Sequence, residues 1–293
     1  MTEQKWTSIV HGVENKTRID WKGLAKCKDL IFLWVRRTFV AQYKQTILGP
    51  AWAIIQPFFT TVVYTIFFGE IAGLGASGVP LFAFYLSGTV IWTLFAHCLT
   101  HTSSTFISNS SIMGKVYFPR LVMPIATAIS QYIAFFIQFV FLVGAVILFM
   151  LTGENVHPNW YIAMTPVLLI QTAMLGMGFG MIISSLTTKY RDLNMVVGFG
   201  MSLWSYCSPV AYDMFGRGKL LEDTVYTIYM LNPMTPIINM FRYAYLGCGG
   251  SAAAGIPAVD WMYYGISWVV TILVAALGAK MFSRVEKTFM DTI

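Results

Sequence analysis

Charge is scarce in this chain. Only 11% of its 293 residues are Asp, Glu, Lys or Arg, against 57% hydrophobic residues and a mean hydropathy of +0.65. So few charged residues leave too little polar surface for a soluble domain, and we therefore expect an integral membrane protein. At about 20 apolar residues per span, the length allows about six membrane helices and leaves no room for a separate soluble catalytic domain.

Cysteine is also rare, and the sequence signs of several protein classes are missing. The four cysteines are scattered and form no CxxC pair, so we expect small core residues rather than disulfide partners. The first 20 residues lack the apolar core and cleavage site of a signal peptide, and we expect them to stay in the mature chain.

His97 and His101 stand four residues apart without an evident third ligand. No metal is therefore expected, and the pair is interpreted as interfacial polar residues, with a shared metal as the alternative.

An energy source is missing too. No GxxxxGK[ST] phosphate loop occurs, so the chain is not expected to hydrolyse ATP by that route, and no cofactor is expected in it. The apolar runs contain essentially none of the acidic or basic residues that relay protons or sodium ions in coupled carriers. An external energy source is therefore predicted. A membrane-embedded transferase or other enzyme is the rival interpretation, and the lack of an acid, base or metal cluster in the runs argues against it.

Six runs almost free of charge are the expected membrane spans. Of the 19 Lys and Arg residues, 16 fall on the side of the two chain ends. Because basic residues concentrate on the cytoplasmic side, both termini are predicted to be cytoplasmic, and the net charge of +6 needs no nucleic-acid partner. The predicted spans cover residues 48–69, 81–100, 121–151, 160–186, 193–210 and 261–279. The domains follow as a cytoplasmic N-terminus (1–47), a six-span membrane domain (48–279) and a cytoplasmic tail (280–293).

Shorter segments lie outside these spans. Residues 21–44 place apolar and basic side chains on opposite helical faces, so an amphipathic helix at the membrane interface is expected. Gly49-Pro50 then turns the chain into the first span. Between the fifth and sixth spans, the apolar runs 225–231 and 236–246 are too short to cross a membrane. They are expected to form two short re-entrant helices, with a folded external loop as the alternative.

Aromatic residues make up 16% of the chain, and several align with polar residues on single helical faces. Most membrane aromatics pack between helices or lie in interfacial belts, which is the simpler interpretation. The alternative is a polar and aromatic wall on which sugar rings slide by stacking. The candidate channel residues are Trp52, Gln56, Phe59, Tyr85, Thr89, Trp92, Met201 and Ser205. Gly176 and Gly180 form a GxxxG pair, which predicts close helix packing rather than substrate contact.

Several motifs resemble one known family. They are the segments QYKQTILGPAWAIIQP and KVYFPR, the YRD turn, and Asn232-Pro233 followed by Arg242. Together they are similar to the membrane subunit of type-2 ABC exporters for cell-surface polysaccharides, which carry O antigen, capsule or teichoic acid. The likeness spans nearly the whole chain. Where the family often has an arginine before Tyr-Lys, this sequence has Gln42, so a charge-based role is not carried over to that position.

The resemblance implies the permease subunit of an ATP-driven exporter. It implies a homodimer of this chain paired with two copies of a separate ATP-binding subunit that holds ATP and Mg. Spans one, two and five would line the channel, the loop 107–120 would be a coupling helix, and the short helices after Pro209 would form an external gate. The expected substrate is a lipid-linked polysaccharide, O antigen foremost, crossing the bacterial inner membrane. An ABC-2 exporter of drugs or lipids is the alternative.

Contact with the ATPase is expected at the end of the amphipathic helix and at the two cytoplasmic turns. The loop 107–120 carries apolar as well as basic side chains, which favours a docking surface, while ordinary topology-setting charge is the alternative. The candidate coupling residues are Tyr43, Lys44, Lys115, Phe118, Arg120, Tyr190 and Arg191.

Overall fold

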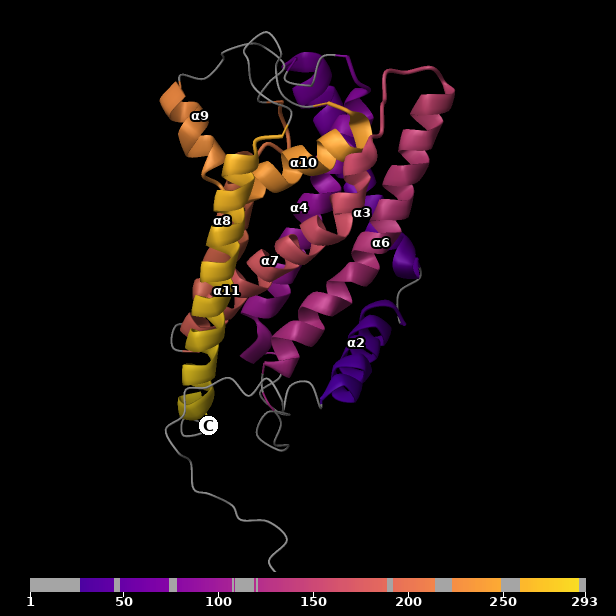
Figure 1. Ribbon diagram of the computed structural model, residues 1–293. Helices are drawn as coiled ribbons and strands as arrows, with labels where there is room; N and C mark the ends of the chain where they lie inside the picture. The colour runs from indigo at the N-terminus through magenta and orange to yellow at the C-terminus, as the bar shows by residue number, and fades with distance from the viewer. Residues whose placement is uncertain are drawn as a thin grey trace, which may run out of the picture.

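The chain folds as a bundle of helices (Figure 1). The computed structural model describes residues 27–44, 48–73, 78–106, 108, 119, 121–188, 192–213, 223–248 and 259–289. Every regular element in these ranges is helical, so the all-α expectation is confirmed for them. Five stretches there are long and apolar enough to cross a membrane: Gly49–Ile71, Leu81–Ser103, Val122–Leu151, Trp160–Thr187 and Trp261–Val285.

The α-helices in the described ranges are, in chain order, α2 (Lys28–Tyr43), α3 (Trp52–Tyr64), α4 (Leu81–Ser103), α6 (Val122–Leu151), α7 (Thr165–Thr187), α8 (Leu193–Tyr206), α9 (Asp223–Met230), α10 (Met234–Leu246) and α11 (Trp261–Phe289). The turn predicted at Gly49-Pro50 is present. Gly49 has a φ of +49°, in the left-handed region that favours glycine, and Pro50 lies in the first turn of the short helix before α3.

Helix α4 lies at the centre of the bundle, packed against α7, α6, α10 and α3. The predicted GxxxG pair brings α7 close to it. A Cβ added at Gly176 would lie 2.8 Å from the carbonyl oxygen of Phe95, and one at Gly180 would lie 2.8 Å from that of Leu99. A side chain at either position would collide with backbone, so the predicted role of both glycines in helix packing is confirmed.

Helix α2 packs against the bundle with part of its apolar arc. Ile31 and Trp34 pack on a cluster that includes Phe106 and Phe282, at the end of the bundle where α11 finishes. We expected this arc to face the membrane interface. The structure shows that Ile31 and Trp34 of this arc cover protein, because the ends of α6 and α11 present an apolar surface there. Whether α2 also touches a membrane stays a prediction.

The fifth predicted span is shorter than expected. Its helix, α8, has 14 residues, which at about 1.5 Å per residue is shorter than the roughly 30 Å of the hydrocarbon core. It nevertheless joins opposite ends of the bundle. Thr187, at the end of α7, lies against Ser103, whereas Val210, after α8, meets α10 near the beginning of α4. The six-span count therefore stays a prediction.

Helices α9 and α10 occupy the region expected to hold two short helices. They have 8 and 13 residues. Helix α10 runs across the bundle, while α9 slopes away from it (Figure 1). Nearly all side chains of α10 are buried, so this helix is packed into the bundle. Its depth in a membrane stays a prediction.

Candidate functional site

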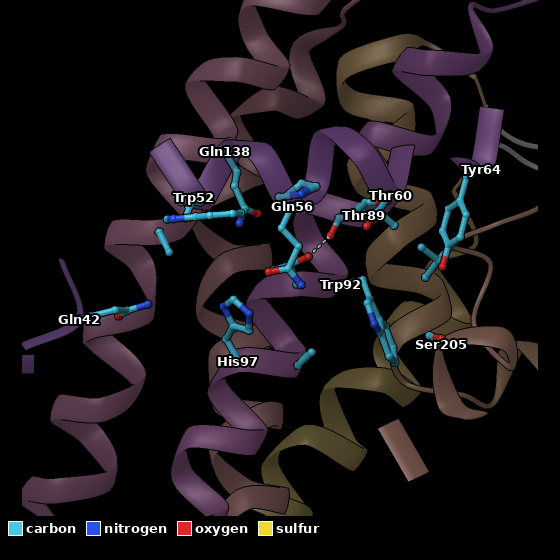
Figure 2. Close-up of a pocket in the computed structure, with 16 residues that line it drawn as sticks. Gln42, Trp52, Gln56, Thr60, Tyr64, Thr89, Trp92, His97, Gln138 and Ser205 are labelled. Atoms are coloured by element: carbon cyan, nitrogen blue, oxygen red, sulfur yellow. Dashed lines mark hydrogen bonds between the residues drawn. The ribbon is translucent and has the colours of Figure 1, made fainter. Parts of the chain in front are cut away.

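A cavity of about 320 Å³ lies between α3, α4, α6 and α8. Five of the eight predicted channel residues line it, and they come from three of the predicted spans (Figure 2). These five are Trp52, Gln56, Thr89, Trp92 and Ser205. The sequence placed them only on faces of separate helices, and the fold brings those faces to one space.

The other three predicted channel residues do not line this cavity. Tyr85 is fully buried, and its ring makes edge-on contacts with the rings of Tyr64 and Phe84. Phe59 is 61% exposed, on the side of α3 turned away from the bundle, and Met201 is buried. The helical face shared by Tyr85 and Trp92 is thus packed at one end and open to the cavity at the other. The channel role of these three residues stays a prediction.

Sequence reasoning missed several lining residues, above all Gln138 on α6, a helix that the predicted wall did not include. Gln138 is one of two glutamines in this 30-residue apolar helix. An amide in such a run was the available signal, because burying a polar group is costly unless it finds a partner. His97, Thr60, Thr93 and Gln42 also line the cavity.

The cavity is polar but uncharged. No Asp, Glu, Lys or Arg is found among its described lining residues, which offer amides, hydroxyls, an imidazole and aromatic rings. His97 lies here with its ring centre 5.8 Å from that of His101. Within the part of the chain that the structure describes, no three His, Cys, Asp or Glu side chains gather in a way that would hold a metal ion.

Most of the predicted coupling residues cannot be placed. Lys115, Phe118, Arg120, Tyr190 and Arg191 lie outside the described residues, as does the side chain of Tyr43. Lys44 follows the last turn of α2 and is exposed. The coupling role of all seven residues therefore stays a prediction.

A buried arginine joins three segments beside the cavity. Arg242 on α10 is 3% exposed. Its Nε donates to the carbonyl oxygen of Phe84 at 3.3 Å, its Nη2 to that of Val210 at 2.7 Å, and its Nη1 to that of Pro209. The guanidinium carbon also lies 3.8 Å from the ring centre of Phe84, within cation–π range. Arg242 thus holds the chain after α8 against the first turns of α4, and the space for its Nη2 exists because Gly88 has no side chain.

Asn232 closes the same junction at the start of α10. Its Nδ2 donates to the carbonyl oxygen of Cys207 at 3.0 Å and to Oγ of Ser208 at 2.9 Å. Its Oδ1 accepts from Nε1 of Trp204 at 3.2 Å and from the backbone N–H of Met234 at 3.1 Å. Both ends of the amide are used, so the side chain fastens the end of α8 to the beginning of α10.

The bundle of apolar helices around an uncharged polar cavity defines a class, the multi-pass membrane proteins of transporter type. The ABC-2 type transporter family matches residues 29–246, well over half of the chain, and the chain belongs to this family. The family provides the membrane subunit of an ABC transporter and not its nucleotide-binding subunit.

Three relatives carry one name, O-antigen export system permease protein RfbA. Two from Klebsiella pneumoniae are 22% and 23% identical to this chain, over 90% of it and 95% of their own length. One from Myxococcus xanthus is 22% identical over 75% of this chain and 82% of its own length. The family resemblance read from the motifs is therefore confirmed.

Proposed function

We propose that this chain is the permease subunit of an ATP-driven exporter that moves a lipid-linked polysaccharide, O antigen foremost, across the bacterial cytoplasmic membrane. The cavity carries this proposal, because two tryptophans and uncharged polar side chains from α3, α4 and α8 face one space in it. Sugar rings have apolar faces and polar edges, so a lining of aromatic rings and hydrogen-bonding groups suits them. The names of the relatives support O antigen, at low identity.

An ABC-2 exporter of drugs or lipids is the second candidate. An apolar substrate would be served by an apolar lining, since burying unpaired polar groups beside it is costly. This cavity instead carries three glutamines and three threonines. Its lining therefore favours a hydroxylated substrate over an apolar one.

Energy and the complete path would come from partners. The proposal assigns ATP and Mg to two copies of a separate ATP-binding subunit, because this chain has no phosphate loop. It also assigns a second copy of this chain to the complex. The resemblance to the exporter family implies this second copy.

The proposed orientation places both termini in the cytoplasm. Helix α2 and the end of α11 lie at the same end of the bundle, which supports this arrangement (Figure 1). The basic residues that precede the first span and follow the last would then face the cytoplasmic leaflet.

Deleting the gene in its own host tests the function. The expected result is loss of the long polysaccharide from the cell surface and its accumulation, lipid-linked, in the cytoplasmic membrane. Both pools are measured by gel electrophoresis of surface material and of extracted lipid carrier. Surface polysaccharide that is unchanged while sensitivity to a hydrophobic drug rises would instead support the drug exporter.

A further inference from the structure

The amide oxygen of Gln138 is buried and yet unpaired. The side chain of Gln138 is 3% exposed, and its Oε1 has no hydrogen-bond partner among the described residues. Figure 2 shows the side chain reaching into the cavity beside Trp52 and Gln56. A buried amide oxygen without a donor costs stability, so this group is expected to have a partner when the protein works. A ligand with a hydrogen-bond donor would supply it.

Neighbouring hydroxyl groups also offer acceptors to the cavity. Thr89 donates its hydroxyl hydrogen to the carbonyl oxygen of Tyr85 at 2.8 Å, and Thr93 donates to that of Thr89 at 2.7 Å. Ser205 donates to the carbonyl oxygen of Ser202 at 2.6 Å. Each of these hydroxyls donates its hydrogen bond within its own helix. It can therefore only accept a hydrogen bond from a ligand in the cavity. The cavity therefore offers these acceptors together with the amide groups of its glutamines, which both donate and accept.

A polar but uncharged lining selects a class of ligand. Phosphate and pyrophosphate are anions, and no Lys or Arg lines this space among the described residues to balance their charge. A cation would bring donors, but no carboxylate lines the cavity to balance its charge. A neutral ligand with several hydroxyls satisfies the acceptors without either cost. Trp52 and Trp92 add rings on which the apolar face of a sugar can stack.

We propose that Gln138, Thr89, Thr93 and Ser205 form a subsite for neutral sugar residues inside the bundle, with Trp52 and Trp92 as its stacking surfaces. At about 320 Å³ the cavity lies near the lower end of the usual range for ligand sites, about 300 to 1,000 Å³, so it takes a short piece of glycan. The subsite admits the glycan and not the phosphate of the lipid carrier. The proposal rests on the proposed export function, from which it takes the glycan, and adds α6 to the helices that touch it.

Gln138→Leu tests the subsite, and Gln131→Leu is its matched control. Both glutamines lie on α6 and are 3% exposed. Gln131 differs because its Nε2 donates to the carbonyl oxygen of Thr127 at 3.3 Å and to Oγ of Ser130 at 3.1 Å, and because it does not line the cavity. Leucine at position 138 removes an unpaired acceptor, so thermal stability should stay the same or rise while export falls severalfold. Leucine at position 131 should leave export unchanged at equal protein amount.

Binding gives the second readout. The complex with its ATP-binding subunit, in lipid nanodiscs, is titrated with an oligosaccharide released from the host's own surface polysaccharide, and tryptophan fluorescence is followed. The expected affinity of Gln138→Leu is about tenfold weaker than that of the wild type, as for one lost hydrogen bond in a buried site. Inorganic pyrophosphate and tetramethylammonium should not compete with the sugar.

Three results would overturn the subsite. They are unchanged export and affinity in Gln138→Leu, a loss of export that only follows a loss of folded protein, and competition by pyrophosphate or tetramethylammonium. Failure of the proposed function looks different, because deletion of the whole gene would then leave surface polysaccharide unchanged. If deletion abolishes export but Gln138→Leu behaves like the wild type, the function stands and the subsite is wrong.

Discussion

Two buried polar centres in this bundle differ in whether their polar atoms have hydrogen-bond partners. Around Arg242, the nitrogens Nε, Nη1 and Nη2 donate to three carbonyl oxygens, and Asn232 close by uses both ends of its amide. Gln138 lines a cavity, and its amide oxygen has no partner among the described residues. Both centres lie against α4, the first at Phe84 and the second at the cavity that Thr89 also lines.

The contrast between the paired Arg242 and the unpaired oxygen of Gln138 suggests that different parts of α4 serve stability and ligand binding. A satisfied polar network in an apolar interior holds segments in fixed positions, whereas an unsatisfied buried group that borders a cavity is available to a ligand. The first turns of α4 are therefore expected to act as a rigid joint, and the turns that follow as a binding wall. Substitutions at the two centres should consequently act on different measurements.

The largest effect is expected from Arg242→Met. Methionine fills part of the volume but removes the donors to the carbonyl oxygens of Pro209 and Val210, while that of Phe84 keeps the hydroxyl of Ser87. Each buried acceptor left without a donor costs about 1 to 3 kcal/mol. The chain should lose most of its folded yield, measured by size-exclusion chromatography of detergent-solubilised protein after graded heating. Arg242→Lys should be intermediate, because lysine keeps the charge but cannot spread three donors in a planar fork. A methionine variant as heat-stable as the wild type would break the comparison.

A smaller loss is expected from Gly88→Ala. The added Cβ would overlap Nη2 of Arg242 and lie 3.2 Å from the carbonyl oxygen of Val210. Overpacking of this kind costs about 1 to 3 kcal/mol. Gly144→Ala on α6 is the control, since an added Cβ there meets no atom within 4 Å. Alanine in an open helical position should be neutral or stabilise by up to about 1 kcal/mol. Equal heat stability of the two variants would show that the arginine junction is loose.

The third contrast, in accessibility rather than in stability, is expected along α4 and α3. In a chain whose four native cysteines are replaced, Trp52→Cys and Trp92→Cys should react with a small water-soluble thiol reagent, because they line the cavity. Tyr85→Cys should not react, because Tyr85 is fully buried in the packed end of the same helix. The measurement is the labelling rate in the assembled, ATP-cycling complex. Equal rates at positions 85 and 92 would mean that the two centres are not separated.

Both tryptophans should also matter for transport in a graded way. Each aromatic ring that stacks on a passing unit contributes modestly, about 1 to 3 kcal/mol where such stacking has been measured on nucleobases. Trp52→Ala or Trp92→Ala alone should therefore slow export, and the double variant should slow it further while the complex still assembles. Loss of folded protein before loss of export would show that the rings serve packing instead.

What the sequence determined by itself follows from one-dimensional patterns. Long runs without charged residues predict membrane spans, and five of the six predicted spans appear as long apolar helices. The Gly49-Pro50 turn and the packing glycines Gly176 and Gly180 also follow locally, because backbone conformation and close approach depend on the residue at that one position. Periodicity showed which residues share a face of one helix, and five of the eight channel candidates line one cavity.

Only the tertiary structure decided which faces meet. Gln138 joins the cavity because α6 packs beside α3 and α4, and no spacing within α6 states which helix will cover it. The same holds for Arg242, whose acceptors at Phe84, Pro209 and Val210 lie 158, 33 and 32 residues away in the chain. Periodicity describes the faces of one helix, whereas contact between helices depends on the complementary shape of surfaces far apart in sequence. For that reason the sequence could not state that Arg242 would find three carbonyl partners, or that Gln138 would line a cavity with its amide oxygen unpaired.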